Sequence, residues 1–429
     1  MTTASEFREL CFMPCRLLKS RFCAALCGSL FWLVLHGITL GADGETWPGF
    51  RGEGRDGHAA RLPRDLSKLE LLWRYELPGS GVGGVAATDD FVVVSGRDKD
   101  DQEDQFVCLD PIVGTELWTL QYPAPLALDY GNSPRATPMI NDPYVYLLGA
   151  GGHFHCVDLD SGEVKWSRHL VDDYQGERPP WGYGGSPLLD ADKLIFQPGG
   201  SHRSIVAVDA KSGKLMWHDK AEQTGYASLQ LIDHGGPRQV FGFDRKSLVG
   251  WDVENGKRLW SVTPEGTTEF HVPMPMVHDK GIITSGENRG TCLYEWVNPQ
   301  QLAPQFQSQQ FELAPDMHSP VANKSFVFGV QDALLAVDVE KEMSIAWRVD
   351  DNAFTQFCSL ILAGDRLLVL TEKSELLLID VTPDAKGDRI LTRENLSDGS
   401  GRSLSHPALV GEVLYVRTNA AISAWSLGE

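Results

Sequence analysis

Three histidines, His271, His318 and His406, have side chains that could hold a metal ion. Each lies in a polar connection that leads into an apolar segment, and Asp316 or Glu269 could add a carboxylate ligand. The three histidines belong to different repeats of the chain, so only folding can decide whether they converge. Because a histidine in a channel wall is more often held by hydrogen bonds, we expect no metal site.

A wider set of aromatic and polar side chains occupies the same kind of connection and could form a ligand-binding surface. Aromatic rings together with arginine and histidine suit a carbohydrate, a peptide or a loop of a partner protein. The alternative is that these side chains simply pack over a rim. The candidate ligand-binding residues are Arg135, Trp181, Tyr183, Tyr226, His271, Asp316, His318, Gln356, Arg402 and His406.

The sequence offers no recognisable catalytic motif. It has no Gly-x-Ser-x-Gly turn, Walker loop, His-Glu-x-x-His or Cys-x-x-Cys, so a hydrolase would have no nucleophile to use. The acidic run at 98–104 could hold Ca²⁺ weakly, but it lacks the glycine and the terminal glutamate of a dedicated calcium loop. We therefore expect a solvated run of charges and assign no catalytic residue.

The elements that position these residues repeat along the chain. The stretch VAVDAKSGKLMW, 206–217, runs from apolar residues to an acid, then to a Ser-Gly pair and a tryptophan. The acid position recurs every 42 to 51 residues, with weaker copies at Glu295, Asp380 and Ser426. The other motif residues are Asp110, Gly114, Trp118, Asp158, Gly162, Trp166, Asp209, Gly213, Trp217, Asp252, Gly256, Trp260, Asp338 and Trp347.

This period is typical of propeller blades, each made of four strands. The acid can accept backbone N–H bonds in a turn, the glycine supplies positive φ, and the tryptophan is expected to face the next blade. Eight acid positions predict eight blades. The chain ends before the outer strand of the last blade, so we expect residues 69–77, with Trp73, to complete it. The predicted fold class is all-β: an eight-bladed propeller of four-stranded antiparallel blades, closed by an N-terminal strand.

The repeat, of the form [VL]-x-[AG]-x-D-x-x-[ST/N]-G-x-x-x-W, resembles that of the pyrroloquinoline-quinone (PQQ) propellers from about residue 70 to the end. The lead-in TWPGFRGEGRDGHAA, 46–60, resembles a segment that precedes such propellers in many secreted bacterial proteins of unassigned role. The resemblance implies one of two classes. Quinoprotein dehydrogenases bind PQQ with Ca²⁺, whereas scaffolds such as the BamB family catalyse nothing.

The dehydrogenase class makes demands that this sequence does not meet. Those enzymes place two adjacent cysteines over the quinone and Glu, Asn and Asp around Ca²⁺, yet this chain has no Cys-Cys pair and no matching stretch. We therefore expect a non-catalytic protein-binding scaffold without a cofactor. The alternatives are a divergent PQQ-dependent dehydrogenase and a propeller that binds glycans at a rim formed by Trp181 and Tyr183.

The N-terminus has the pattern of a secretory signal. Four basic residues precede an apolar run that ends in small residues, so residues 1–42 are expected to be a signal peptide, with a membrane anchor as the alternative. The protein would then be periplasmic or extracellular. Residues 43–68 form a lead-in, in which we expect Trp47 and Phe50 to tuck beneath the ring and Arg51 to meet an acidic rim. Residues 69–429 form the propeller.

The net charge of the chain limits the classes of partner that it can bind. The net charge of −20 disfavours a nucleic-acid partner, because no basic stripe is available to neutralise phosphates. We expect a monomer whose partner is a protein or a glycan.

The four cysteines outside the leader are expected to be small core residues rather than disulfide partners; they are Cys108, Cys156, Cys292 and Cys358.

Overall fold

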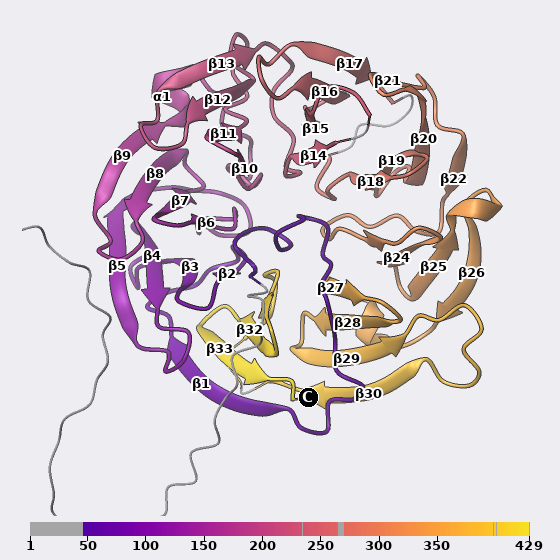
Figure 1. Ribbon diagram of the computed structural model, residues 1–429. Coiled ribbons are helices and arrows are strands. Elements are labelled where there is room, and N and C mark those ends of the chain that lie inside the picture. The colour runs from indigo at the N-terminus through magenta and orange to yellow at the C-terminus, as the bar shows by residue number, and fades with distance from the viewer. Residues whose placement is uncertain (1–45, 234, 265–269, 398, 400, 429) are drawn as a thin grey trace, which may run out of the picture. The chain divides into compact units, whose positions relative to one another are not determined.

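The computed structural model describes residues 46–428 except 234, 265–269, 398 and 400, so the predicted signal peptide lies outside the described residues. The described chain forms eight antiparallel sheets arranged around one axis (Figure 1), which confirms the predicted eight-bladed propeller. We letter the strands of each blade A to D from the axis outward. The described helices are α1 (Leu170–Tyr174) and the 3-10 turns η1 (Val339–Lys341) and η2 (Asn352–Phe354). None of them is long and apolar enough to cross a membrane.

The strands of the first four blades follow the sequence in order. They are β2 (Ala86–Ala87), β3 (Val92–Arg97), β4 (Glu103–Leu109) and β5 (Glu116–Pro123) in blade 1; β6 (Met139–Asn141), β7 (Tyr144–Leu148), β8 (His153–Asp158) and β9 (Val164–His169) in blade 2; β10 (Leu188–Asp190), β11 (Lys193–Phe196), β12 (Ile205–Asp209) and β13 (Leu215–Asp219) in blade 3; β14 (Gln230–Ile232), β15 (Gln239–Phe243), β16 (Leu248–Asp252) and β17 (Arg258–Val262) in blade 4.

The other four blades include one enlarged sheet and the closing sheet. Their strands are β18 (Met276–His278), β19 (Gly281–Gly286), β20 (Gly290–Asn298), β21 (Gln301–Leu302) and β22 (Ser308–Gln310) in blade 5; β23 (Val321–Ala322), β24 (Phe326–Val330), β25 (Leu334–Asp338) and β26 (Ser344–Val349) in blade 6; β27 (Cys358–Ala363), β28 (Arg366–Thr371), β29 (Glu375–Asp380) and β30 (Ile390–Asn395) in blade 7; β31 (Ala408–Val410), β32 (Val413–Arg417), β33 (Ala421–Ser426) and β1 (Glu70–Glu76) in blade 8.

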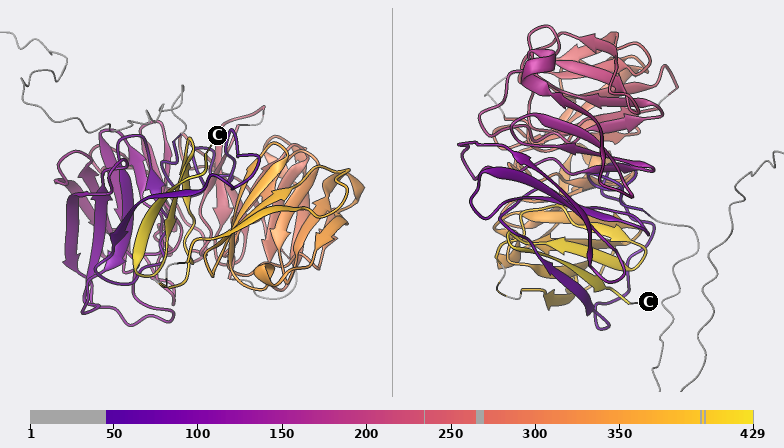
Figure 2. Two further views of the ribbon diagram at one scale, coloured as in Figure 1. Left: turned by 90° about the horizontal axis from the view of Figure 1, so that it is seen from below. Right: turned by 90° about the vertical axis from the view of Figure 1, so that its left-hand side faces the viewer.

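The N-terminal strand closes the ring as expected. β1 pairs antiparallel with β33, with Trp73 opposite Ala424 and Glu70 opposite Ser426. In Figure 1 the indigo β1 lies outside the yellow β33, and Figure 2 shows the same pairing from the side. The pairing leaves no open edge where the two ends of the propeller meet.

The repeated motif joins one blade to the next. In blade 3, Asp209 accepts the backbone N–H of Ser212 (2.8 Å), and Gly213 takes a φ of 64° in the tight turn. A Cβ on Gly213 would lie only 2.7 Å from the indole of Trp166 in blade 2. Trp166 in turn donates its Nε1–H to the carbonyl of Ala210 (3.0 Å). Each regular turn therefore seats the tryptophan of the preceding blade. The seams of this kind are Trp73–Gly114, Trp118–Gly162, Trp166–Gly213 and Trp217–Gly256.

The apolar core lies mainly in these seams between blades. One cluster joins Phe154 and Trp166 of blade 2 to Phe196 and Val206 of blade 3, and all four side chains are buried. The structure confirms that the four described cysteines are buried core residues, because each belongs to such a cluster. Large flat rings suit the space between two twisted sheets.

Blade 5 departs from the repeat, and the expectation for Glu295 was wrong. β20 continues through Glu295 to Asn298, so no turn forms after the acid. The chain turns at 299–300 into β21, and the later strand β22 also pairs with β20. Because blade 5 presents no glycine turn, the tryptophan of blade 4 finds another partner: Trp260 donates its Nε1–H to Gln239 of its own blade (2.7 Å).

The lead-in lies across the inner strands of the propeller. Trp47 and Ala87 exchange two backbone hydrogen bonds of 2.8 Å, and Pro48 accepts the N–H of Ile140 (2.7 Å). Further along the lead-in, Ala59 donates its N–H to the carbonyl of Leu362 in blade 7 (2.9 Å). Figure 1 shows this indigo segment crossing the centre of the ring before it reaches β1. The lead-in therefore ties blades 1, 2 and 7 together from within.

Two buried arginines of the lead-in extend this brace. Arg55 donates to the carbonyls of Ser186, Pro187 and Leu229, in blades 3 and 4, at 2.8–3.1 Å. The expectation that Arg51 meets an acidic rim was wrong, because its Nη2 donates to the carbonyls of Asp56 (2.9 Å) and Pro320 (2.6 Å). Burial lowers the pKa of both guanidinium groups, to about 10 for Arg51 and about 9 for Arg55.

Candidate functional site

The predicted site residues all come from connections between strand D of one blade and strand A of the next. Strands alternate in direction within a blade, so these connections share one face of the ring with the turns between strands B and C. We call it the D–A face. Propellers and other closed β-structures place ligands at such mouths, so this face is the candidate binding surface.

Three of the predicted residues meet at one cavity over blades 5 to 7. Asp316, His318 and Gln356 line a cavity of about 300 Å³, together with Phe354 and Phe357. Asp316 and Gln356 are exposed, whereas His318 is only 5% exposed. The arrangement is a polar mouth over a partly aromatic floor.

The cavity also includes two acids that the sequence interpretation missed. Glu287 lies in the B–C turn of blade 5, and Asp332 lies in the B–C turn of blade 6. The sequence interpretation considered only the connections between blades. The signal was present, because an antiparallel blade brings its B–C turn to the same face as those connections.

His318 is fixed in one tautomer by its surroundings. Its Nε2 lies 2.9 Å from the carbonyl oxygen of Val330, which can only accept, so Nε2 carries the proton. Nδ1 is then an acceptor, and no hydrogen-bond partner for it lies among the described residues. Burial lowers the pKa of His318, so the ring is neutral at neutral pH.

The loop that carries Gln356 is held by a helix cap. Asp351 accepts the backbone N–H of Ala353 (2.9 Å) at the start of η2. The same carboxylate accepts a hydrogen bond from Arg393 on β30 (2.6 Å). This cap positions Phe354, a fully buried residue that lines the cavity.

A second group of predicted residues forms an aromatic cluster on the other side of the D–A face. The Trp181 ring lies 4.9 Å from that of Tyr226, 4.6 Å from that of Phe270 and 5.9 Å from that of Tyr130. Tyr130 is 85% exposed and Phe270 is 50% exposed. We refer to these four residues as the aromatic cluster. The sequence interpretation included Trp181 and Tyr226 but assigned no role to Phe270.

Arg135 supports the loop that presents Tyr130. Its guanidinium donates to the backbone carbonyls of Ser133, Asp129 and Gly131 at 2.8–2.9 Å. Burial lowers its pKa. Tyr183 lies apart from the cluster: it is 2% exposed, and its hydroxyl donates to the carbonyl of Pro198 (3.0 Å).

The other two predicted histidines are wall residues. His271 is 5% exposed and stacks on Phe243 with ring centroids 4.0 Å apart, and burial lowers its pKa to about 4. His406 lies against Phe50 (4.8 Å), and its pKa falls to about 3 through burial and then through the positive charge of Arg51. Within the described ranges, no three His, Cys, Asp or Glu residues form a metal-ligand group. Glu269 lies outside the described residues.

Arg402, the last predicted residue, is engaged with an acid. Its Nε is ion-paired with Glu372, and its backbone N–H donates to Asn419 (2.9 Å). The Arg402 side chain is 61% exposed, so this ion pair lies at the rim of the D–A face.

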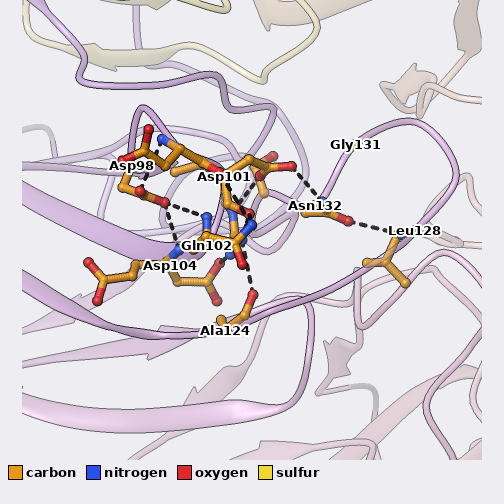
Figure 3. Close-up of polar contacts among 12 residues, drawn as sticks. Asp98, Asp101, Gln102, Asp104, Ala124, Leu128, Gly131 and Asn132 are labelled. Carbon is orange, nitrogen blue, oxygen red and sulfur yellow. Dashed lines mark hydrogen bonds and ion pairs between the residues drawn. The ribbon is translucent and has the colours of Figure 1, made fainter.

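The acidic run at 98–104 is bound to donors of the protein itself (Figure 3). Asp98 accepts the N–H groups of Gln102 and Glu103, both at 2.6 Å. Arg97, which is 1% exposed, pairs with Asp101 (2.8 Å) and Asp104 (2.6 Å). These carboxylates therefore neutralise a buried arginine and order a loop, which the charge pattern alone did not reveal.

That network also reaches the loop of the aromatic cluster. Asp101 accepts a hydrogen bond from Asn132 (2.6 Å), and Asn132 in turn accepts the N–H of Leu128 (2.9 Å), as Figure 3 shows. The connection that carries Tyr130 is thereby anchored to blade 1. A fixed exposed ring is better suited to recognition than a mobile one, because less entropy is lost on binding.

Comparisons with known proteins identify relatives that share this propeller fold. The family model described as "Outer membrane protein assembly factor BamB" matches residues 66–175 and 131–349, about two thirds of the chain. The outer membrane protein assembly factor BamB of Moranella endobia (strain PCIT) is 32% identical over 92 residues, which are 21% of this chain. The match spans only 20% of that relative's length.

Two solved structures show the same fold. Quinohemoprotein alcohol dehydrogenase from Comamonas testosteroni superposes with a TM-score of 0.67 at 13% identity, over 90% of this chain and 81% of that one. BamB from Moraxella catarrhalis superposes with a TM-score of 0.58 at 13% identity, over 83% of this chain and 99% of that one. At such low identity the likeness is one of fold alone.

Proposed function

Because this chain belongs to the family of PQQ-like propellers described as outer membrane protein assembly factor BamB, we propose that it is an exported scaffold that binds a protein partner and catalyses no reaction. The observation that carries the proposal is the aromatic cluster on the D–A face. Tyr130 exposes most of its surface and Phe270 exposes half of its surface, and both lie beside the half-buried Trp181. Exposed groups of large apolar rings mark interaction sites, and tryptophan and tyrosine are the usual anchors of protein interfaces.

The donor groups available also support a role without a quinone. The calcium that accompanies PQQ needs several oxygen ligands. Within the described part of the chain, no three acidic, histidine or cysteine side chains form such a group. Arg51 and Arg55, which lie near the axis, donate to backbone carbonyls. None of these contacts favours a quinone–calcium pair, and the incubation with PQQ and Ca²⁺ described below tests for one.

The partner-binding role can be tested with a photo-crosslinking amino acid at Tyr130. A matched control carries the same group at Ile112, a 63% exposed residue in the C–D turn on the opposite face. We expect one specific adduct from Tyr130 and none from Ile112 in native cells. Adding Trp181→Ala should abolish that adduct. Equal labelling at both positions, or none at Tyr130, would contradict the proposal.

Two further measurements separate the alternatives. Incubation with PQQ and Ca²⁺ should give neither stoichiometric quinone absorbance nor dye-linked dehydrogenase activity, and turnover with bound quinone would overturn the scaffold role. Fractionation of native cells should place the protein outside the cytoplasm. A purely cytoplasmic protein would contradict the exported role.

A glycan is the second candidate ligand, because the rings around Trp181 are also suited to stacking on sugars. A glycan array with the purified chain tests this. Specific binding that Trp181→Ala removes would favour the glycan, whereas a blank array would eliminate it.

A further inference from the structure

The cavity over blades 5 to 7 contains hydrogen-bond acceptors and negative charge in excess. Glu287, Asp316 and Asp332 line it, all three are exposed, and none belongs to an ion pair within the described ranges. Arg348 lies close enough to Asp332 to interact electrostatically, but its guanidinium is already bonded to Asp350 (2.6 Å). Carboxylates that lack a cation of their own favour a cationic ligand.

The interior of the same cavity adds an independent indication. His318 is 5% exposed, lines the cavity and has an Nδ1 without a partner among the described residues. Because Nε2 carries the proton, Nδ1 can only accept a hydrogen bond. A buried acceptor without a donor is costly, and an N–H group that reached this edge of the ring from the cavity would satisfy it. The neutral ring would not repel a cation.

We propose that this cavity receives the ammonium group of a lysine side chain presented by the partner protein. The inference rests on the proposed protein-binding function. An ammonium group is a compact charge with three donors, which suits three separate carboxylates better than a planar guanidinium does. The aromatic side chain of Phe357 offers apolar surface to the methylene stem of the lysine. A volume of about 300 Å³ is at the lower end for ligand pockets, and so suits a single side chain.

The charge of the whole chain favours the same partner. A net charge of −20 attracts basic proteins and raises their rate of association. The cavity would add specificity to that general attraction, because it fixes where one positive charge must lie.

The binding chemistry can be tested with Nα-acetyl-lysine methylamide and the full chain, by saturation-transfer NMR titration. The norleucine analogue, which lacks the ammonium group, is the control ligand. We expect binding of the lysine compound only, weakened at least tenfold in Asp316→Asn/Asp332→Asn. The control variant Asp160→Asn, an exposed acid in a C–D turn on the opposite face, should change binding less than twofold. Equal binding of both compounds, or no effect of the double substitution, would overturn the inference.

The role in partner binding is tested with the Tyr130 crosslink in the same variants. A crosslink reduced at least fivefold by Asp316→Asn/Asp332→Asn and unchanged by Asp160→Asn supports the inference. A crosslink that persists in the double variant overturns the inference while the scaffold function stands. If Tyr130 gives no adduct even in the unsubstituted protein, the scaffold function itself fails, whatever the lysine titration shows.

Discussion

The seam between blades 2 and 3 and the seam between blades 6 and 7 place a tryptophan at the same point of the repeat but hold it differently. Trp166 is 8% exposed, packs on Gly213 and donates its Nε1–H to the carbonyl of Ala210. Trp347 is half-buried, and its Nε1 has no partner among the described residues. Its ring is instead covered by the guanidinium of Arg389, at 4.2 Å.

The difference arises in the following blade, not at the tryptophan. Blade 3 turns within four residues, from Asp209 to a glycine of positive φ, and so presents a flat seat. Blade 7 has a longer connection between β29 and β30, in which Gly387 comes seven residues after Asp380. The tryptophan of one repeat therefore depends on the glycine of the next, so the seam is a property of two adjacent repeats.

The largest expected effect is the loss of a regular seam tryptophan. Trp166→Ala should lower the free energy of unfolding by about 3–5 kcal/mol, because it empties a filled space between two sheets. Trp347→Ala should cost clearly less, since that ring is half-buried. Urea unfolding followed by circular dichroism measures both. Equal losses would show that the two seams contribute alike.

Alanine substitutions at two turn glycines separate the cost of steric overlap with a tryptophan from the cost of backbone strain. Gly213→Ala and Gly387→Ala both place alanine at positive φ, 64° and 91°, which costs about 1–2 kcal/mol. Only the first adds a clash with an indole, because nothing lies within 4 Å of a Cβ on Gly387. Overpacking should add about 1–3 kcal/mol at Gly213. Thermal unfolding of both variants measures the two losses of stability. Equal losses would show that Gly213 does not form a packing surface for Trp166.

The turn acid should contribute less than either packing residue. Asp209→Ala removes the bond to the N–H of Ser212 and should cost about 1 kcal/mol. The hydrogen bond from the Ser212 side chain lowers the pKa of Asp209, so this contribution is present at neutral pH and is lost as the pH falls below the ordinary range of an aspartate. Hydrogen exchange at Ser212 should quicken in the variant. Asp160→Ala in blade 2 should leave its own turn unchanged.

The smallest expected effect is at the irregular seam. Arg389→Ala removes the cation over Trp347 and should cost about 0.5–1 kcal/mol. Acrylamide quenching should increase for one tryptophan, and Arg389→Lys should restore part of the protection. An unchanged quenching curve would mean that Arg389 does not cover the ring in solution.

The regular seams could be predicted from the sequence to the level of blade count and strand order, because the motif repeats at a fixed spacing. The position of Trp73 before the first acid also indicated the closing strand, which the pairing with β33 confirms. Blade 5 could not be predicted in this way. Glu295 occupies the acid position, yet the strand continues past it, since no glycine follows to turn the chain.

The candidate site was predicted only in part. Asp316, His318 and Gln356 were proposed from their connections, and the structure brings them to one cavity. Glu287 and Asp332 were missed because they belong to turns inside blades. The antiparallel strand order places such a turn on the same face as the connections between blades, but nothing in the local sequence says which turn and which connection line one cavity.

The sequence by itself determined the number of blades, the closing strand and the residues that form the regular seams. These features follow from turn chemistry and spacing that act within one repeat or between neighbours. Only the folded structure decided that Arg97 is neutralised by the acidic run, that the lead-in crosses the axis, and that Glu287, Asp316 and Asp332 line the same cavity as His318. The contacts of the lead-in and of the cavity join segments from different blades, so they exist only once the ring has closed, whereas the Arg97 ion pairs form within one hairpin that no repeat motif marks.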